Sequence, residues 1–89
     1  MAIFRRADDV QSTPVGDRLV LFHRATGASI VLNPSAAILW RVLEHPSTAQ
    51  DLVGHLCRRH EGLSAERATE DVNRCLVQFV SQSIVTSDG

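Results

Sequence analysis

The chain has 89 residues and a net charge of −1, because its nine cations, all of them arginine, are set against ten acidic residues. The 44% hydrophobic content excludes a disordered chain, and the charge balance argues against a general nucleic-acid binder, which needs surplus cations to displace counterions from phosphate. The absence of lysine excludes Schiff-base chemistry, and the length suits one small domain over residues 1–89.

The N-terminus and the cysteine count bear on the cellular compartment. Arg5 and Arg6 arrive before any signal-peptide hydrophobic region can form, and the longest apolar stretch, 36–40, is far shorter than the ~20 residues that span a bilayer. Two cysteines are too few for a disulfide framework. We therefore expect a soluble, cytoplasmic and reduced protein.

The first third of the chain predicts three β-strands. Residues 10–13 form a short half-polar strand that ends at Pro14. Residues 18–23 are apolar on both faces, which is typical of a central strand covered on both sides. A connection ending in Gly27 leads to a third strand at 29–32, so the last two strands should form an antiparallel hairpin.

Two helices should follow this hairpin. Asn33 can cap the first, with Pro34 at its first helical position, where a missing N–H costs nothing. Pro46 should end that helix. Ser47 and Gln50 match the capping-box pattern at the start of the second.

A third helix should begin after Ser64 and fray near 81–83. Residues 84–85 are apolar and should return to the core, whereas the first few residues and 86–89 look loose. The element order is therefore three strands followed by three helices, an α+β fold.

The strand at 28–32 is the feature that bears most on function. If the strands pair in sequence order, this strand lies at an edge of the sheet with an unpaired row of N–H and C=O groups. It carries no Lys, Pro or inward charge that would protect this edge against pairing with another strand. The N-terminal segment or a second copy of the chain could cover it. Alternatively, an extended peptide could add as a further strand.

Catalytic and metal sites find little support in the sequence. The four histidines and two cysteines contain no CxxC or HxxxH spacing, so we expect no metal and no cofactor. Cys57 and Cys75 fall on apolar helical stripes, where a thiol is inert. We therefore expect no catalysis, although a self-contained hydrolase remains an alternative.

A small winged-helix DNA-binding regulator is a second alternative, since three helices and a hairpin describe that fold. The third helix would read the groove, but its Arg67 and Arg74 are outnumbered by Glu66, Glu70 and Asp71. The hairpin also precedes the helices, whereas a wing normally follows the recognition helix. We therefore expect no nucleic acid among the partners.

Several short motifs, in order, resemble the PqqD-like family. They are the strand 17–22, the turn Thr26-Gly27, the pair Leu32-Asn33, the helix 36–43 and the helix 68–79 with its Asp71-Val72 pair. The resemblance covers nearly the whole chain. One departure is Ser83-Ile84-Val85, where the family often has Gly-Leu-Val.

The resemblance implies a winged-helix-like precursor recognition element of three strands and three helices. Such a domain binds the leader segment of a ribosomally synthesised precursor peptide and delivers it to a modifying enzyme. The chain is most similar to the stand-alone leader-binding half of split lasso peptide B proteins, whose partner is a leader protease. A chaperone role in pyrroloquinoline quinone synthesis is the alternative within the family.

The expected peptide site lies between the third strand and the third helix. Backbone groups of the strand should bond the peptide, and side chains that helical rotation brings to the cleft should select it. The predicted residues are Ala28, Ser29, Ile30, Val31, Leu32, Arg67, Asp71, Arg74, Cys75 and Gln78. Apolar leader side chains should lie beside Ile30 or Val31 and Cys75, with Arg67 and Arg74 holding acidic ones.

Overall fold

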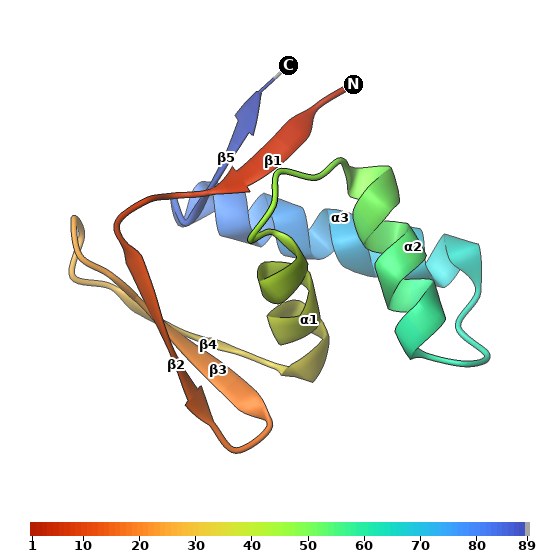
Figure 1. The fold of residues 1–89 in the computed structure, drawn as a ribbon, viewed down its shortest axis with the longest axis horizontal. Coiled ribbons are helices and arrows are strands. Elements are labelled where there is room, and N and C mark those ends of the chain that lie inside the picture. Colours follow the sequence, from red (N-terminus) through yellow and green to blue (C-terminus); the bar gives the residue numbers. More distant parts are fainter. Residues whose placement is uncertain (89) are drawn as a thin grey trace.

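Five strands and three helices make up residues 1–88, the part of the chain described by a computed structural model (Figure 1). They are β1 (Ile3–Arg6), β2 (Val10–Val15), β3 (Arg18–His23), β4 (Ser29–Leu32), α1 (Pro34–Val42), α2 (Ala49–Arg59), α3 (Ala65–Ser81) and β5 (Val85–Asp88). The predicted α+β class, with a three-stranded antiparallel sheet followed by three helices, is confirmed.

The three-stranded sheet has the order β2-β3-β4, with every pair antiparallel. Leu19, Leu21 and His23 on β3 face the helices and are buried. On the opposite face Val20 is half-buried and Phe22 is 41% exposed. The prediction that β3 is covered on both sides was therefore wrong, because all three helices lie on one side of this sheet (Figure 1).

The β3–β4 turn contains a bulge at Gly27. The Gly27 N–H donates to the His23 carbonyl at 2.8 Å, and the His23 N–H donates to the Ala28 carbonyl at 2.9 Å. Two residues thus lie opposite one, with Gly27 in the left-handed region at φ 75°. This is the G1 type of bulge, which favours glycine at its first position.

The first helix begins as the sequence predicts but ends earlier. The Asn33 side chain accepts a hydrogen bond from the Ala36 N–H at 2.9 Å, and Pro34 opens the helix. The helix ends at Val42 with Leu43 as its C-cap, so Pro46 lies beyond a short turn.

The capping box of α2 lies one residue further along than expected. Thr48, not Ser47, caps the helix, and its hydroxyl and the Asp51 carboxylate each accept a hydrogen bond from the other residue's N–H at 3.1 Å. Ser47 is unavailable because it is buried and bridged to β1. Its N–H donates to the Phe4 carbonyl at 3.0 Å, and its carbonyl accepts from the Phe4 N–H at 2.8 Å.

The two ends of the chain pair with each other, which corrects the expectation that both are loose. β1 and β5 form a separate antiparallel ribbon, seen at the top of Figure 1. The Arg5 guanidinium lies 2.6 Å from the Asp88 carboxylate. Arg6 donates two hydrogen bonds to the Trp40 carbonyl, at 2.6 and 2.9 Å, and its guanidinium lies 4.5 Å from the Trp40 ring centroid. Gly89 lies outside the described residues.

The third helix starts after Ser64, as predicted, and ends in a closed cap rather than a frayed turn. The Ile84 N–H donates to the Phe79 carbonyl at 3.1 Å, and the Ser83 N–H donates to the Val80 carbonyl at 3.0 Å. This is the Schellman pattern, and Ser83 occupies its left-handed position at φ 62°. Ile84 and Val85 are buried, so the predicted return of the chain to the core is confirmed.

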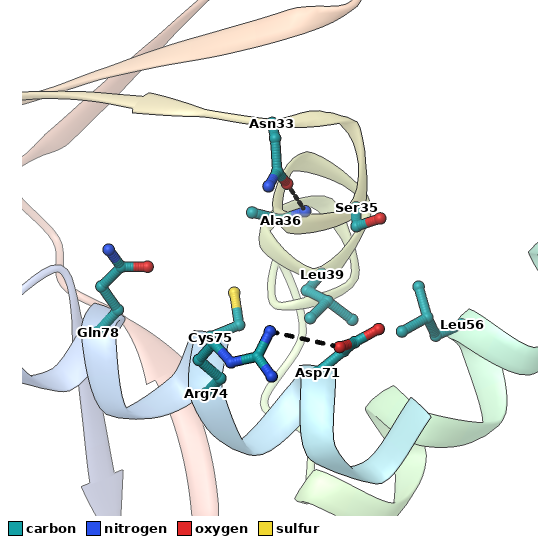
Figure 2. Close-up of a pocket in the computed structure, with 9 residues that line it drawn as sticks. All are labelled: Asn33, Ser35, Ala36, Leu39, Leu56, Asp71, Arg74, Cys75 and Gln78. Atoms are coloured by element: carbon teal, nitrogen blue, oxygen red, sulfur yellow. Dashed lines mark hydrogen bonds and ion pairs between the residues drawn. The ribbon is translucent and has the colours of Figure 1, made fainter. Parts of the chain in front are cut away.

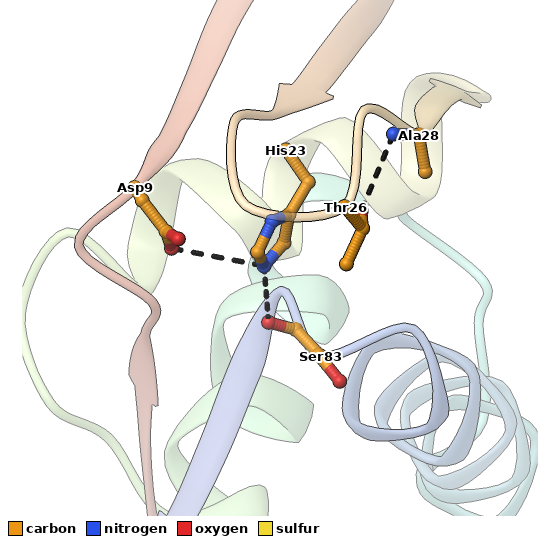
Figure 3. Close-up of polar contacts among 5 residues, drawn as sticks. All are labelled: Asp9, His23, Thr26, Ala28 and Ser83. Carbon is orange, nitrogen blue, oxygen red and sulfur yellow. Dashed lines mark hydrogen bonds and ion pairs between the residues drawn. The ribbon is translucent and has the colours of Figure 1, made fainter.

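The core joins helices and sheet around Trp40, which is 2% exposed, as its helical spacing predicts. Its ring meets Phe79 of α3 edge to face, with centroids 6.1 Å apart. A second link runs from His23, whose buried Nε2 donates to the Ser83 carbonyl at 3.0 Å and lies 3.7 Å from the Asp9 carboxylate (Figure 3). These contacts hold the hairpin at a fixed position beside the C-terminal end of α3.

Candidate peptide-binding site

The free edge of β4 offers backbone groups at alternate residues. Because His23 and Ala28 form a hydrogen-bonded pair, the register places Ile30 and Leu32 in the same kind of pair with β3. The N–H and C=O groups of the intervening residues, Ser29 and Val31, therefore point away from the sheet. Within the predicted strand 28–32, these two residues can bond an added strand.

A hollow of about 270 Å³ separates this edge from α3. The side chains of Ile30 and Leu32 lie on the face of β4 that is turned toward the helices. The residues lining the hollow come from β4, α3 and the start of α1, together with Arg18: Arg18, Ile30, Val31, Leu32, Asn33, Ala36, Gln78, Phe79 and Gln82. An added strand would project alternate side chains into this space.

A second hollow, of about 200 Å³, lies between the first turn of α1 and the middle of α3 (Figure 2). Its lining residues are Asn33, Ser35, Ala36, Leu39, Leu56, Asp71, Arg74, Cys75 and Gln78. Four of the predicted site residues, Asp71, Arg74, Cys75 and Gln78, thus lie together along one side of α3. Gln78 also lines the hollow beside β4, so the two spaces adjoin.

Cys75 gives the second hollow an apolar wall. Its sulfur points toward α1 in Figure 2, and burial raises the pKa of the thiol to about 12. The unprotonated form is thereby disfavoured, so the thiol stays neutral at physiological pH and behaves as a small apolar group. This position suits an apolar peptide side chain rather than a nucleophilic reaction.

Asp71 and Arg74 supply the charge at this hollow. The Arg74 Nη1 lies 3.6 Å from the Asp71 Oδ1, and the two side chains are 75% and 36% exposed. An ion pair this exposed contributes less than about 1 kcal/mol. The guanidinium can therefore exchange Asp71 for an acidic group of a ligand at little cost.

Three of the predicted residues lie apart from the hollows. Arg67 lines neither of them, nor do the side chains of Ala28 and Ser29. Ser29 contributes outward backbone groups only, and the Ala28 carbonyl is used by His23. Arg67 therefore lies outside both hollows, and its predicted role in holding an acidic leader residue stays a prediction.

Sequence reasoning missed the contribution of α1. Asn33, Ser35 and Ala36 line the second hollow because α1 starts directly after β4 and brings its first turn opposite α3. The signal was present in the Asn33-Pro34 helix start, which places the first turn at the end of the edge strand. Gln82, one helical turn beyond Gln78, was also missed.

Other kinds of site find no support in residues 1–88. In that range no three histidine, cysteine or carboxylate side chains gather as metal ligands. None of the described helices is both long and apolar enough to cross a bilayer.

Comparison with known proteins gives one family and two similar structures. The family model described as "Coenzyme PQQ synthesis protein D (PqqD)" matches residues 18–85, whereas no curated protein sequence matches the chain. The structure of TbiB1 in complex with the TbiA(beta) leader peptide superposes with a TM-score of 0.82 at 21% identity, covering 91% of this chain and 93% of that one.

A second solved structure, a lasso peptide synthetase B1 complexed with the leader peptide, has a TM-score of 0.78 at 19% identity and covers 93% of this chain and 96% of that one. Both likenesses extend over almost the whole of each chain and confirm the fold. Because the family model spans β3, β4, all three helices and the start of β5, which is well over half of the chain, the chain belongs to the PqqD family.

Proposed function

We propose that this chain is a non-catalytic adaptor that binds the leader segment of a ribosomally synthesised precursor peptide as an added strand on β4. The observation that carries the proposal is the unobstructed β4 edge, with Ser29 and Val31 pointing outward next to hollows along α3. Edge pairing supplies affinity through the main chain, while pockets for alternate side chains supply selectivity.

The adaptor would present the bound leader to a separate processing enzyme, for which a lasso peptide leader protease is the leading candidate. Both similar structures are described as complexes with a leader peptide, one of them as a lasso peptide synthetase B1, and both match this chain over nearly their full length. The family description, in turn, names coenzyme PQQ synthesis. An experiment must therefore determine which class of precursor peptide the chain binds.

A non-catalytic role agrees with the chemistry of the site. Burial keeps Cys75 protonated, with a pKa of about 12, whereas a nucleophilic cysteine needs a lowered pKa and a partner base. Cys57, on α2, is half-buried and packs against the core. Cleavage of a bound leader would then require the partner enzyme.

The test is a binding assay with labelled ligands of different classes. Fluorescence anisotropy would compare leader peptides from lasso precursors, the precursor of pyrroloquinoline quinone and a random DNA duplex. We expect saturable binding of one leader class and no cleavage of it. Salt-sensitive binding of the duplex without binding of any leader would instead establish the DNA-binding alternative.

A further inference from the structure

A continuous trough extends from β4 past the start of α1 to the turn between α2 and α3. The two hollows already described share Asn33, Ala36 and Gln78. The second hollow in turn shares Ser35, Leu56 and Asp71 with a third, of about 350 Å³, that is completed by residues 60–63. We call these three adjoining hollows the trough.

The β4 edge alone is too short to account for stable binding. Ser29 and Val31 offer four outward backbone groups, and each hydrogen bond of this kind gives only a small net stabilisation. Association costs translational and rotational freedom, a cost at least as large as the stabilisation from all four bonds together. Side-chain contacts in the trough must therefore supply the net affinity.

An added strand cannot continue to pair beyond Leu32, because the chain enters α1 at Pro34. A longer peptide that keeps its direction leaves the sheet at this point and passes between the first turn of α1 and α3. The trough continues along that path, over Leu56, whose side chain is 1% exposed, to half-buried Leu63.

The chemistry of the trough changes along its length. Near β4 the lining contains one cation, Arg18, and no carboxylate, beside the uncharged amides of Asn33, Gln78 and Gln82. At the far end the lining includes the carboxylates of Glu61 and Asp71 and the imidazole of His60, and it contains no arginine. Arg74, 3.6 Å from the Asp71 carboxylate, is exposed and lines the adjoining hollow. The far hollow therefore repels an acidic side chain and favours a basic one, above an apolar floor of Leu56 and Leu63.

Resting on the proposed function, we propose that the peptide bound at β4 continues past Leu32 as an unpaired extended segment. That segment places an apolar side chain over Leu56 and Leu63 and a lysine or arginine between Glu61 and Asp71. The recognised sequence is thus bipartite: a strand half that pairs with Val31, and an unpaired half that fills the far hollow.

A displayed library of random peptides of about twelve residues tests this without knowledge of the natural leader. An extended peptide of that length spans about 40 Å, longer than the 37 Å largest dimension of the molecule, so it can cover the whole trough. Selected binders should combine alternating apolar residues with a basic residue toward one end. Removing the basic end should weaken binding at least about tenfold, a loss of ~1.4 kcal/mol.

Charge reversal at the far hollow is the second part of this experiment. Glu61→Lys should weaken the full-length binder about fivefold and leave the shortened binder unchanged, since an exposed ion pair contributes ~1 kcal/mol or less. Glu70→Lys is the matched control, because Glu70 is exposed on α3 and lines none of the three hollows. Circular dichroism should show that both variants are folded.

Two results would overturn the bipartite site: equal affinity of full-length and shortened binders, or equal effects of the Glu61 and Glu70 variants. Failure of the proposed function has a different signature. In that case the library would yield no binders, or binders whose affinity does not change when β4 is blocked by Val31→Pro.

Discussion

The central sheet has two edge strands, β2 and β4, and only β4 keeps a backbone N–H at each of its outward positions. On β2 the Arg24 N–H donates to the Asp9 carbonyl at 2.9 Å, so the register turns Val10, Ser12 and Pro14 outward. Pro14 lacks an N–H at one of these outward positions. On β4 the outward residues are Ser29 and Val31, and both keep their donors.

The two edges differ in their surroundings as well. Residues 11–15 of β2 are all exposed, and three of them are polar, whereas Ile30 and Leu32 of β4 turn toward the hollows beside α3. A proline on an edge strand is a common protection against unwanted pairing. The difference between the two edges predicts that a peptide adds to β4, where the donors are free and a neighbouring helix can select side chains, and not to β2.

The strongest test of this comparison blocks each edge with proline. Val31→Pro removes an outward N–H without touching the β3–β4 hydrogen bonds and should weaken leader binding by about a hundredfold or more, because the ring also obstructs docking. Ser12→Pro makes the same change on β2 and should leave binding unaltered. Anisotropy with a bound leader measures both.

Ile30→Pro is the structural control for these variants. The Ile30 N–H faces β3, so this proline should destabilise the fold itself, seen as a lower midpoint of thermal unfolding. If folded Val31→Pro and Ser12→Pro bind leader equally well, the difference between the edges has no role in binding.

The second test fills the hollow that only β4 possesses. Cys75→Phe places a larger side chain in the space between α1 and α3 and should lower leader affinity about tenfold, the loss of one buried apolar anchor. Val77→Phe is the control, because Val77 is 71% exposed and lines neither of the hollows nearest β4. Equal affinities of the two variants would argue against Cys75 as a wall of the site.

The third test concerns the cap that holds the end of α3 beside the sheet. Ser83→Gly relieves a left-handed serine at φ 62° and should raise the free energy of unfolding by up to about 1 kcal/mol. Urea denaturation measures the change. Leader affinity should stay the same, since the variant retains the residue 83 carbonyl that accepts the hydrogen bond from His23. A lower free energy of unfolding in the variant would show that the left-handed serine is not strained.

The smallest effect is the pH dependence contributed by Cys75, which should be absent near neutral pH. Burial raises the pKa of this thiol in the folded state to about 12 from its ordinary value of 9.0. The unfolded thiol therefore ionises first, so this group should make folding less stable as pH rises from 9 toward 12. Cys75→Ala should remove that part of the decline; identical pH profiles for parent and variant would show that the thiol is not desolvated.

Local signals in the sequence were sufficient for the elements that surround the site. Asn33-Pro34 and Ser64 marked helix starts through caps that act within a few residues, and Gly27 marked the bulge of the hairpin. The periodic apolar residues of α3 also indicated that Asp71, Cys75 and Gln78 share one side of the helix, and in the structure all three line the hollow between α1 and α3. Each of these depends on interactions between residues close in the chain.

The capping of α2 shows where such signals fail. Ser47 matched the pattern as well as Thr48 did, and the contact with Phe4, over forty positions away, decided between them. The same distance in sequence concealed the β1–β5 ribbon, whose four-residue strands lie at opposite ends of the chain. A short strand carries no sequence signal that identifies the distant strand with which it pairs.

The amino-acid sequence by itself therefore determined the order of the elements from β2 to α3, the open β4 edge and most of the α3 residues that line the neighbouring hollows. Only the tertiary structure decided that Pro14 blunts the other edge at an outward position, that Ser29 and Val31 present the free donors, and that α1 closes the trough. The physical reason is that hydrogen-bond direction and cavity walls depend on register and packing between distant segments, which no local pattern encodes.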